Sequence, residues 1–434
     1  MSVAKPSFLR SALLTYGTQL LLLPLSLGAA ALQARLIGPA GRGQVSLLVT
    51  AVALTSLFLG LGLAGSITFH VASGKVVPRG LVTVLTKYLA GVVLVLALGI
   101  ALVHRLGGGT ALIGSLEPTR AYPVLLALVS LGLVNGWLAA TLSARGAFAS
   151  LNSVSLAVGL VPICIYAAVM TSGPAHAPVE FVFLALVSAE VARLVLLFAA
   201  VRVAERGFQP GPTNEPLRSL IAYSGLAFAC DIVQFLTYRA DVWIIRGFRG
   251  DTELGQYSLA VSLAELTLLA AGAFSTVLFP RVPTLARSEA IRTTTRVGAL
   301  TLVTTAAIAA VGFALAIPLV PRLFTEAFRP SVALLGILLI GVVPMSLAKI
   351  LGNYFGGTGQ LKVNLAAAIV GMVVCLTGDL LTIPRFGATA AAVCTVVAYS
   401  VFTAILLIAF VARSGQSLRS LAAGLRVTTG GLQP

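Results

Sequence analysis

The sequence of 434 residues contains little charge, since Asp, Glu, Lys and Arg together make up only 10% of it. A soluble domain carries about 25% charged residues, so this composition argues against a soluble protein. Hydrophobic residues make up 58%, and the mean hydropathy is +1.02. The apolar runs are continuous and do not alternate with polar residues, which favours membrane helices over membrane strands. The composition therefore predicts an all-α integral membrane protein.

Cysteine is also scarce, and its spacing argues against two kinds of site. Cys164, Cys230, Cys375 and Cys394 all lie in apolar segments, and no pair has CxxC spacing. This pattern indicates small packing residues and predicts neither a disulfide framework nor a metal site. A phosphate-binding loop of the type GxxxxGK is missing as well, so ATP hydrolysis is not expected. We predict no catalytic residues, no metal centre and no resident cofactor.

Twelve apolar segments are long enough to cross a bilayer, which takes about 20 helical residues. Their approximate ranges are 10–34, 43–70, 81–103, 121–143, 151–171, 179–203, 219–247, 255–280, 295–317, 331–355, 362–383 and 388–411. The loops on the side of the two termini hold more Lys and Arg than the opposite loops, which predicts that both termini are cytoplasmic. Anionic lipid at that surface accounts for the net charge of +16 without a nucleic acid partner.

The chain contains an internal repeat. GQVSLLVTAV beginning at Gly43 and GQYSLAVSLA beginning at Gly255 share five residue types at equal offsets, 212 residues apart. Six predicted crossings separate the two copies, so both copies begin helices that run in the same direction. This describes two parallel six-helix lobes around a central cavity, a plan found among transporters. The predicted lobes are 1–205 and 217–434, the second with a basic cytoplasmic tail, and 206–216 is the cytoplasmic linker.

Charged residues lie within the predicted spans. The seventh span carries Asp231, Arg239 and Asp241. A charge near the bilayer centre costs about 2.5–3.5 kcal/mol on insertion scales, so such residues face protein or a water-filled cavity. We therefore expect a polar cavity on one side of this helix and lipid on the other.

Four stretches together resemble a known family. They are ARLIGPAGRGQVSLL at 34–48, YRADVWIIRGF at 238–248, ELGQYSLAVSLAEL at 253–266 and IPRFGATAAA at 383–392. In order and spacing they are similar to the polysaccharide-export flippases, of the oligosaccharide and O-antigen type, of the multidrug/oligosaccharidyl-lipid/polysaccharide exporter superfamily. The motif positions are Gly38, Gly43, Asp241, Gly255, Pro384 and Gly387. In one departure, Asp379 stands where the pattern has Asn.

The resemblance implies a flippase that works by alternating access in the bacterial plasma membrane. Its substrate would be a polyprenyl-pyrophosphate-linked oligosaccharide, moved from the inner to the outer leaflet for cell-surface polysaccharide synthesis. Membrane lipids and other membrane proteins of polysaccharide synthesis are the implied partners.

A pyrophosphate that crosses the membrane needs cations along its path. Arg193, Arg239 and Lys349 lie within predicted spans and are the candidates for substrate binding. Structural roles are equally open at this point. Glu190 can neutralise Arg193, Asp241 can pair with Arg239, and Lys349 can extend to the membrane surface.

Acids within the spans are candidates for coupling transport to a Na⁺ or H⁺ gradient. Asp231 and Glu265 are predicted near the middle of the membrane, where a carboxylate can bind either ion. The alternative is a structural partner, either Arg239 or a hydroxyl of a neighbouring helix. Asp379 is expected near an outer helix end, where a charge needs less explanation.

Two other functions stay open. A cation-coupled multidrug or small-solute exporter of the same superfamily would have the same lobes but a cavity dominated by acids. A membrane glycan polymerase or ligase would need a large outer loop, and the longest predicted outer loop, about 104–120, offers only Glu117 and His104. A lipid II flippase is closer in kind, but two further helices would be expected for it.

Overall fold

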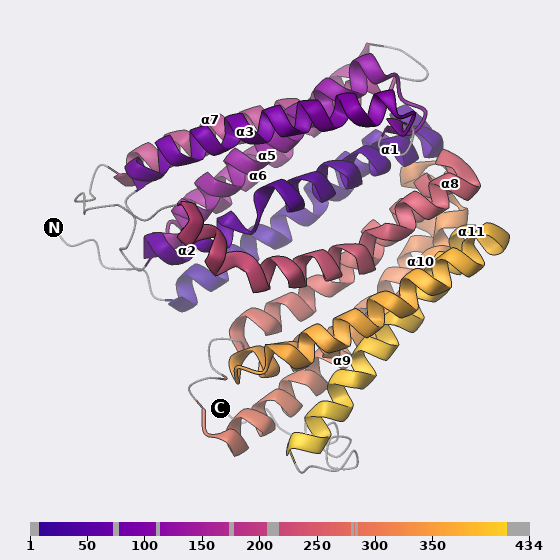
Figure 1. The fold of residues 1–434 in the computed structure, drawn as a ribbon. Coiled ribbons are helices and arrows are strands. Elements are labelled where there is room, and N and C mark those ends of the chain that lie inside the picture. Colours follow the sequence, from indigo (N-terminus) through magenta and orange to yellow (C-terminus); the bar gives the residue numbers. More distant parts are fainter. Residues whose placement is uncertain are drawn as a thin grey trace. The chain divides into compact units, whose positions relative to one another are not determined.

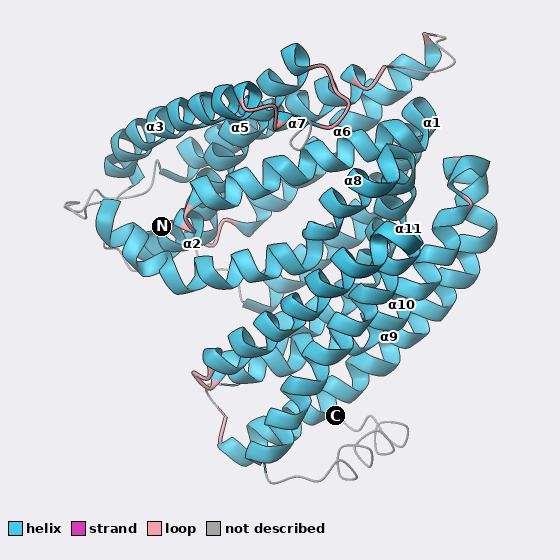
Figure 2. Cartoon of the chain, turned by 45° about the vertical axis from the view of Figure 1, so that its right-hand side comes forward, coloured by secondary structure: helices cyan, strands magenta, loops and turns pink. Residues whose placement is uncertain are grey.

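The computed structural model describes residues 8–72, 78–109, 113–172, 178–205, 217–278, 282 and 285–414. Within these ranges the chain is helical and contains no strand (Figure 2). The elements are α1 (Phe8–Gly60), α2 (Leu63–Ala72), α3 (Pro78–Arg105), α5 (Pro118–Ala144), α6 (Phe148–Thr171), α7 (Glu180–Glu205), α8 (Leu217–Leu278), α9 (Arg287–Phe324), the short 3₁₀ helix η2 (Glu326–Phe328), α10 (Pro330–Gly357) and α11 (Leu361–Ser414) (Figure 1).

Nine helices in the described ranges are long and apolar enough to cross a membrane. Three of the nine, in α1, α8 and α11, contain two helices joined at a glycine with non-helical backbone angles: Gly38, Gly250 and Gly387. Counting each of these three as two crossings gives the predicted twelve. The all-α membrane fold is confirmed, although the predicted span 43–70 is interrupted where Leu61 and Gly62 have φ angles of 46° and 66°.

The glycine kinks follow the internal repeat. Gly38 has φ 63° and ψ −173°, and Gly250, 212 positions later, has φ 85° and ψ −179°. Both conformations lie in a region of backbone angles that side chains with a Cβ avoid. The corresponding turns of the two halves therefore depend on glycine for the same reason.

A hydrogen bond repeats at the same spacing. Gln44 donates from Nε2 to Ser115 Oγ at 2.8 Å, and Gln256 donates from Nε2 to the carbonyl oxygen of Ala327 at 3.0 Å. The two partners of each bond are 71 residues apart. Each glutamine thus ties the helix that follows its kink to the short segment before the fourth helix of the same half, which in the second half is η2.

Contacts divide the chain into two compact units between Ile232 and Val233, within α8. We call the part before this point unit 1 and the part after it unit 2. The predicted linker 206–216 lies outside the described residues, as do the start of the chain and the tail from residue 415. The predicted lobe boundaries and the cytoplasmic termini stay predictions.

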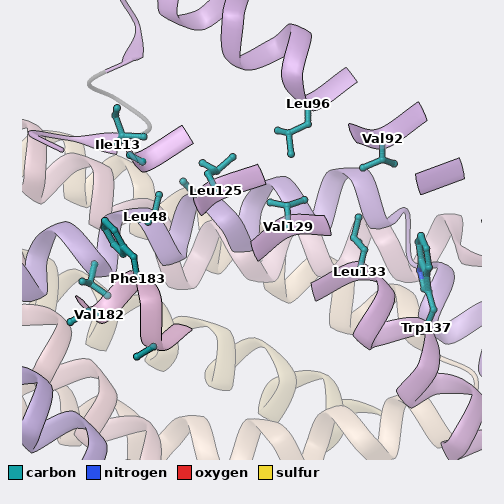
Figure 3. Packing of buried hydrophobic residues seen from close by; sticks show 14 of the residues in the cluster. Leu48, Val92, Leu96, Ile113, Leu125, Val129, Leu133, Trp137, Val182 and Phe183 are labelled. Atoms are coloured by element: carbon teal, nitrogen blue, oxygen red, sulfur yellow. The ribbon is translucent and has the colours of Figure 1, made fainter. Parts of the chain in front are cut away.

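The core of unit 1 is built on one face of α5. Leu125, Val129, Leu133 and Trp137 recur every four residues and are all buried. Figure 3 shows them in a row, with Val92 and Leu96 of α3 among the side chains that pack near them. A spacing of four residues keeps side chains on the same face of a helix, so the sequence itself sets this packing surface.

In unit 2, α10 packs against both α9 and α11 (Figure 1). A Cβ added at Gly341 would lie 2.8 Å from Val396 Cα, and one added at Gly336 would lie 2.8 Å from the Phe313 ring. Apolar side chains gain little by leaving lipid, so membrane helices associate mainly through close van der Waals packing at small residues. These two glycines allow that approach.

The third kink is closed by a side chain from another helix. Glu253 of α8 accepts a hydrogen bond from the Ala388 backbone N–H at 2.6 Å and pairs with Arg249 at 3.0 Å. It therefore caps the helix that begins after Gly387, where backbone N–H groups otherwise lack partners. A Cβ at Gly387 would collide with the Glu253 carboxylate.

We predict that Gly387→Ala destabilises the protein more than Gly250→Ala does. Both substitutions force alanine into an unfavourable backbone conformation, which costs roughly 1–3 kcal/mol. Only Gly387→Ala also displaces the Glu253 cap, because a Cβ at Gly250 meets open space. The apparent melting temperature of purified protein in detergent measures the difference, and equal decreases would show that the cap contributes nothing.

Candidate functional site

Asp241 is a buried carboxylate in the first half of α8, with a side chain 5% exposed. Its Oδ2 accepts a hydrogen bond of 2.5 Å from the hydroxyl of Tyr257, in the second half of the same helix. In a straight helix these residues would be about 24 Å apart, so the kink at Gly250 is what brings them together. Thr395 Oγ1 of α11 lies 3.4 Å from the Tyr257 hydroxyl, whereas Asp241 Oδ1 is buried without a hydrogen-bond partner.

Asp379 of α11 is a second buried carboxylate, only 1% exposed. Its Oδ2 accepts a hydrogen bond from the Cys375 thiol at 3.5 Å, and its Oδ1 is buried without a partner. A thiol is a weak donor, so this carboxylate is poorly satisfied. Asp379 lies eight residues, about 12 Å, before the kink at Gly387, and its expected place near the outer end of the span stays a prediction. Cys375, expected to be a packing residue, also donates this hydrogen bond to Asp379.

The two carboxylates interact electrostatically with each other. A cavity of about 20 Å³ lies beside Asp241 and is lined by Tyr257, Thr395 and Glu265 among others. This volume holds one water molecule or one small cation. Carboxylate and hydroxyl oxygens with unused lone pairs can take up a proton or a hard cation. No group of three or more His, Cys, Asp and Glu side chains in the described ranges is placed to hold a metal ion.

Three of the predicted site residues lie together in unit 2. Arg239 Nη2 lies 3.0 Å from Glu265 Oε1, and the two side chains are 37% and 47% exposed. The partner of Arg239 in the ion pair is therefore Glu265 and not Asp241. Lys349 on α10 is half-buried and interacts electrostatically with Glu265, but it forms no ion pair with a described residue.

The other two candidates are placed differently. Arg193 of α7, in unit 1, pairs with Glu190 at 3.0 Å, and Glu190 Oε2 also accepts a hydrogen bond from Asn135 at 2.7 Å. Asp231 of α8 is exposed and forms no ion pair with a described residue. The substrate and coupling roles of all five residues stay predictions.

Most of the motif positions shape turns. Gly38 and Gly387 are kink residues, and Pro384 precedes the second of these kinks by three residues. Gly43 and Gly255 are buried, each one residue before a tethering glutamine. Asp241 alone among the motif positions contributes a side chain to the buried acid site.

The sequence matches the family model described as polysaccharide biosynthesis protein over residues 8–286. This range covers well over half of the chain. The chain belongs to this family. The predicted resemblance to polysaccharide-export flippases is thereby confirmed at the level of the family. A comparison with curated proteins finds no significant match.

Solved structures share the fold. A lipid II flippase, MurJ, in an inward closed conformation aligns over 97% of this chain and 94% of its own, with a TM-score of 0.68 and 14% identity. An inward-facing multidrug resistance transporter of the MATE family and the MOP superfamily aligns over 92% and 95%, with a TM-score of 0.63 and 15% identity. A MOP superfamily transporter from Pyrococcus furiosus aligns over 93% and 94%, with a TM-score of 0.55 and 15% identity. At these identities the likeness establishes the membrane fold.

We predict that Tyr257→Phe destabilises unit 2 by about 1–3 kcal/mol, because Asp241 would lose its hydrogen-bond donor while still buried. Tyr399→Phe is the matched control, since Tyr399 lines the same cavity and its hydroxyl does not bond to Asp241. Thermal unfolding of both variants in detergent measures the effect. Equal melting temperatures for the two variants would mean that the Tyr257 hydroxyl does not stabilise Asp241.

Proposed function

We propose that this protein is a flippase for polyprenyl-pyrophosphate-linked oligosaccharide and moves it from the inner to the outer leaflet of the bacterial plasma membrane. Membership in the polysaccharide biosynthesis family supports a role in cell-surface polysaccharide synthesis. The fold shared with a lipid II flippase and a MATE transporter supports alternating access as the mechanism. In this proposal both termini are cytoplasmic, no covalent step is catalysed, and the partners are membrane lipids and other membrane proteins of polysaccharide synthesis.

The observation that carries the proposal is the Lys349 ammonium group, which is half-buried and forms no ion pair with a described residue. Arg239 and Lys349 share one partly exposed acid, Glu265. Asp241 is also near Arg239, but it is buried and held by the Tyr257 hydroxyl. A half-buried ammonium group without an ion-pair partner favours an anionic ligand, and a pyrophosphate has that charge.

The small cavity beside Asp241 cannot hold the solute of the alternative function, export of cationic solutes. That function would require acids in a cavity that admits an organic molecule, and such pockets have volumes of about 300–1,000 Å³. The cavity beside the buried carboxylate Asp241 has about 20 Å³. Its size suits a coupling ion and excludes a drug.

We therefore assign coupling to Asp241 and Asp379 in this proposal, with H⁺ or Na⁺ as the ion. Both carboxylates have a buried oxygen without a partner, so they gain most from a proton or a small cation. Glu265 already forms an ion pair with Arg239. Asp231 is exposed, so an ion bound to it would not be enclosed by the protein.

The first test of this proposal concerns coupling. We predict that Asp379→Asn and Asp241→Asn abolish the dependence of transport on the ion gradient, because an amide neither titrates nor carries charge. Asp231→Asn, which removes one exposed acid from α8, should retain that dependence. Flipping of a fluorescent lipid-linked oligosaccharide by proteoliposomes, with and without imposed gradients, makes the measurement. Unchanged gradient dependence in both buried-acid variants would rule out their coupling role.

The second test separates substrate binding from internal pairing. If Arg193 and Arg239 bind the pyrophosphate, alanine at either position removes a charge-assisted hydrogen bond of roughly 1.5–3 kcal/mol, so export should fall about ten- to a hundredfold. Lysine should restore only part of it, because the planar fork of donors is lost. Glycan export, normalised to inserted protein, is the measurement.

Double variants provide the control for this test. Arg193→Gln with Glu190→Gln, and Arg239→Gln with Glu265→Gln, remove both partners of each ion pair together. They should insert normally yet still export poorly. Full export by both double variants would contradict substrate binding by these arginines.

Deletion of the gene tests the function as a whole. The expected result is accumulation of a lipid-linked oligosaccharide on the cytoplasmic side, and the structure of its sugar identifies the natural substrate. Normal levels of all such lipids would contradict the proposal.

A further inference from the structure

A second cavity in unit 2 lies at the end of the helices where α11 stops. It has a volume of about 430 Å³. It is lined by Val282 and Leu285 before α9, the start of α9, the end of α10, the turn that follows α10 and the end of α11. It shares no lining residue with the small cavity beside Asp241. Its size falls in the range of sites that hold a small ligand.

Two arginines from distant parts of the chain are fixed at this cavity. Arg287 Nη2 donates to the Arg413 carbonyl oxygen at 2.7 Å, although the two residues are 126 positions apart. The Arg413 guanidinium donates to Gln360 and lies 5.7 Å from the centre of the Phe355 ring. Gln360 in turn donates to Thr358 Oγ1 at 3.2 Å. These contacts position both guanidinium groups and leave further N–H donors on each.

The charge of this pair is not balanced by the protein. Neither Arg287 nor Arg413 forms an ion pair with an acid among the residues that the structure describes. The nearest acid in sequence, Glu289, is exposed and forms none either. Both arginines are exposed at the cavity, so their guanidinium groups are accessible to an anion. The planar donor fork of guanidinium matches the oxygens of a phosphate group.

The position of the cavity and its other walls narrow the ligand class. The ends of membrane-spanning helices lie at the level of the lipid headgroups, where basic pockets bind anionic headgroups. Val282, Leu285 and Ala290 form an apolar wall of the cavity. A free phosphate ion would leave that wall unused, whereas the glycerol and upper acyl carbons of a lipid would cover it.

We propose that this cavity binds the headgroup phosphate of an anionic phospholipid through Arg287 and Arg413. The bound lipid joins the start of α9 to the end of α11 and stabilises the packing of unit 2 at the membrane surface. This role is independent of which substrate the protein transports.

The test is a lipid titration of the whole purified protein in neutral detergent. Phosphatidylglycerol is added in increasing mole fraction, with phosphatidylcholine as the neutral comparison, and the melting temperature is recorded. We expect phosphatidylglycerol alone to raise the melting temperature. Arg287→Gln and Arg413→Gln should each raise the half-saturating fraction at least about tenfold, as expected for the loss of a charge-assisted hydrogen bond. Arg287→Lys should retain more binding than Arg287→Gln.

Arg292→Gln is the matched control, because it removes one exposed positive charge from the same end of α9 without touching the cavity. It should leave the titration within about twofold of the wild type, since only the general surface attraction is reduced. If Arg413→Gln does not fold, the three variants at Arg287 and Arg292 decide the result.

Three outcomes would overturn the proposal. If Arg287→Gln and Arg292→Gln weaken phosphatidylglycerol binding equally, general surface charge and not the cavity would explain the binding. The same stabilisation by inorganic phosphate would assign the cavity to a free anion. Stabilisation by a polyprenyl pyrophosphate and not by phosphatidylglycerol would make it a docking site for the transport substrate. The lipid titration measures no transport. A negative result would therefore contradict the lipid site without contradicting the proposed flippase function.

Discussion

The constraint on which this structure depends is the absence of water in the hydrocarbon region of a membrane. Each backbone N–H and C=O must there find a partner within the protein, so the chain is helical and changes direction in few places. At three of those places the change is made by a single glycine with non-helical backbone angles, Gly38, Gly250 or Gly387. At the last of them a carboxylate from another helix supplies the backbone partner that the helix start lacks.

The same constraint acts on the side chains of unit 2, where it separates two groups of acids. Glu265 is partly exposed and neutralised by Arg239, so it needs no further partner. Asp241 and Asp379 are enclosed, and each has one oxygen without a hydrogen bond. Burying an acid with an unsatisfied oxygen costs free energy, because the desolvated group lacks the partners that water supplied. Position alone therefore separates acids of similar chemistry into a paired group and a poorly satisfied group.

Much of the fold could be predicted from the sequence, because a membrane-spanning helix is specified by one continuous stretch of residues. Length and apolarity identify a crossing, and the Gly–Gln pattern identified the repeat that the kinks and glutamine tethers follow. The pairing of Arg193 with Glu190 was also open to prediction, because residues three apart share a helix face. The break at Leu61 and Gly62 was not, since the apolar pattern continues across it.

The candidate site could be predicted only in part, because its contacts join residues far apart in the chain. Arg239 finds its partner 26 residues away, and the Tyr257 hydroxyl approaches Thr395 across 138 residues. Spacing along one helix could not reveal either contact. The presence of Asp379 in place of the expected Asn was the one available signal, and its significance becomes clear only once its burial is known.

The internal repeat also shows how far the two halves have diverged. At the spacing of 212 residues, the counterparts of Asp241, Tyr257, Asp379 and Thr395 are Ala29, Val45, Ala167 and Phe183. All four counterparts are apolar, so the first half has no equivalent of the Asp241–Tyr257 hydrogen bond or of Asp379 at this spacing. The pair of buried acids therefore occurs once in the chain, even though the architecture is duplicated.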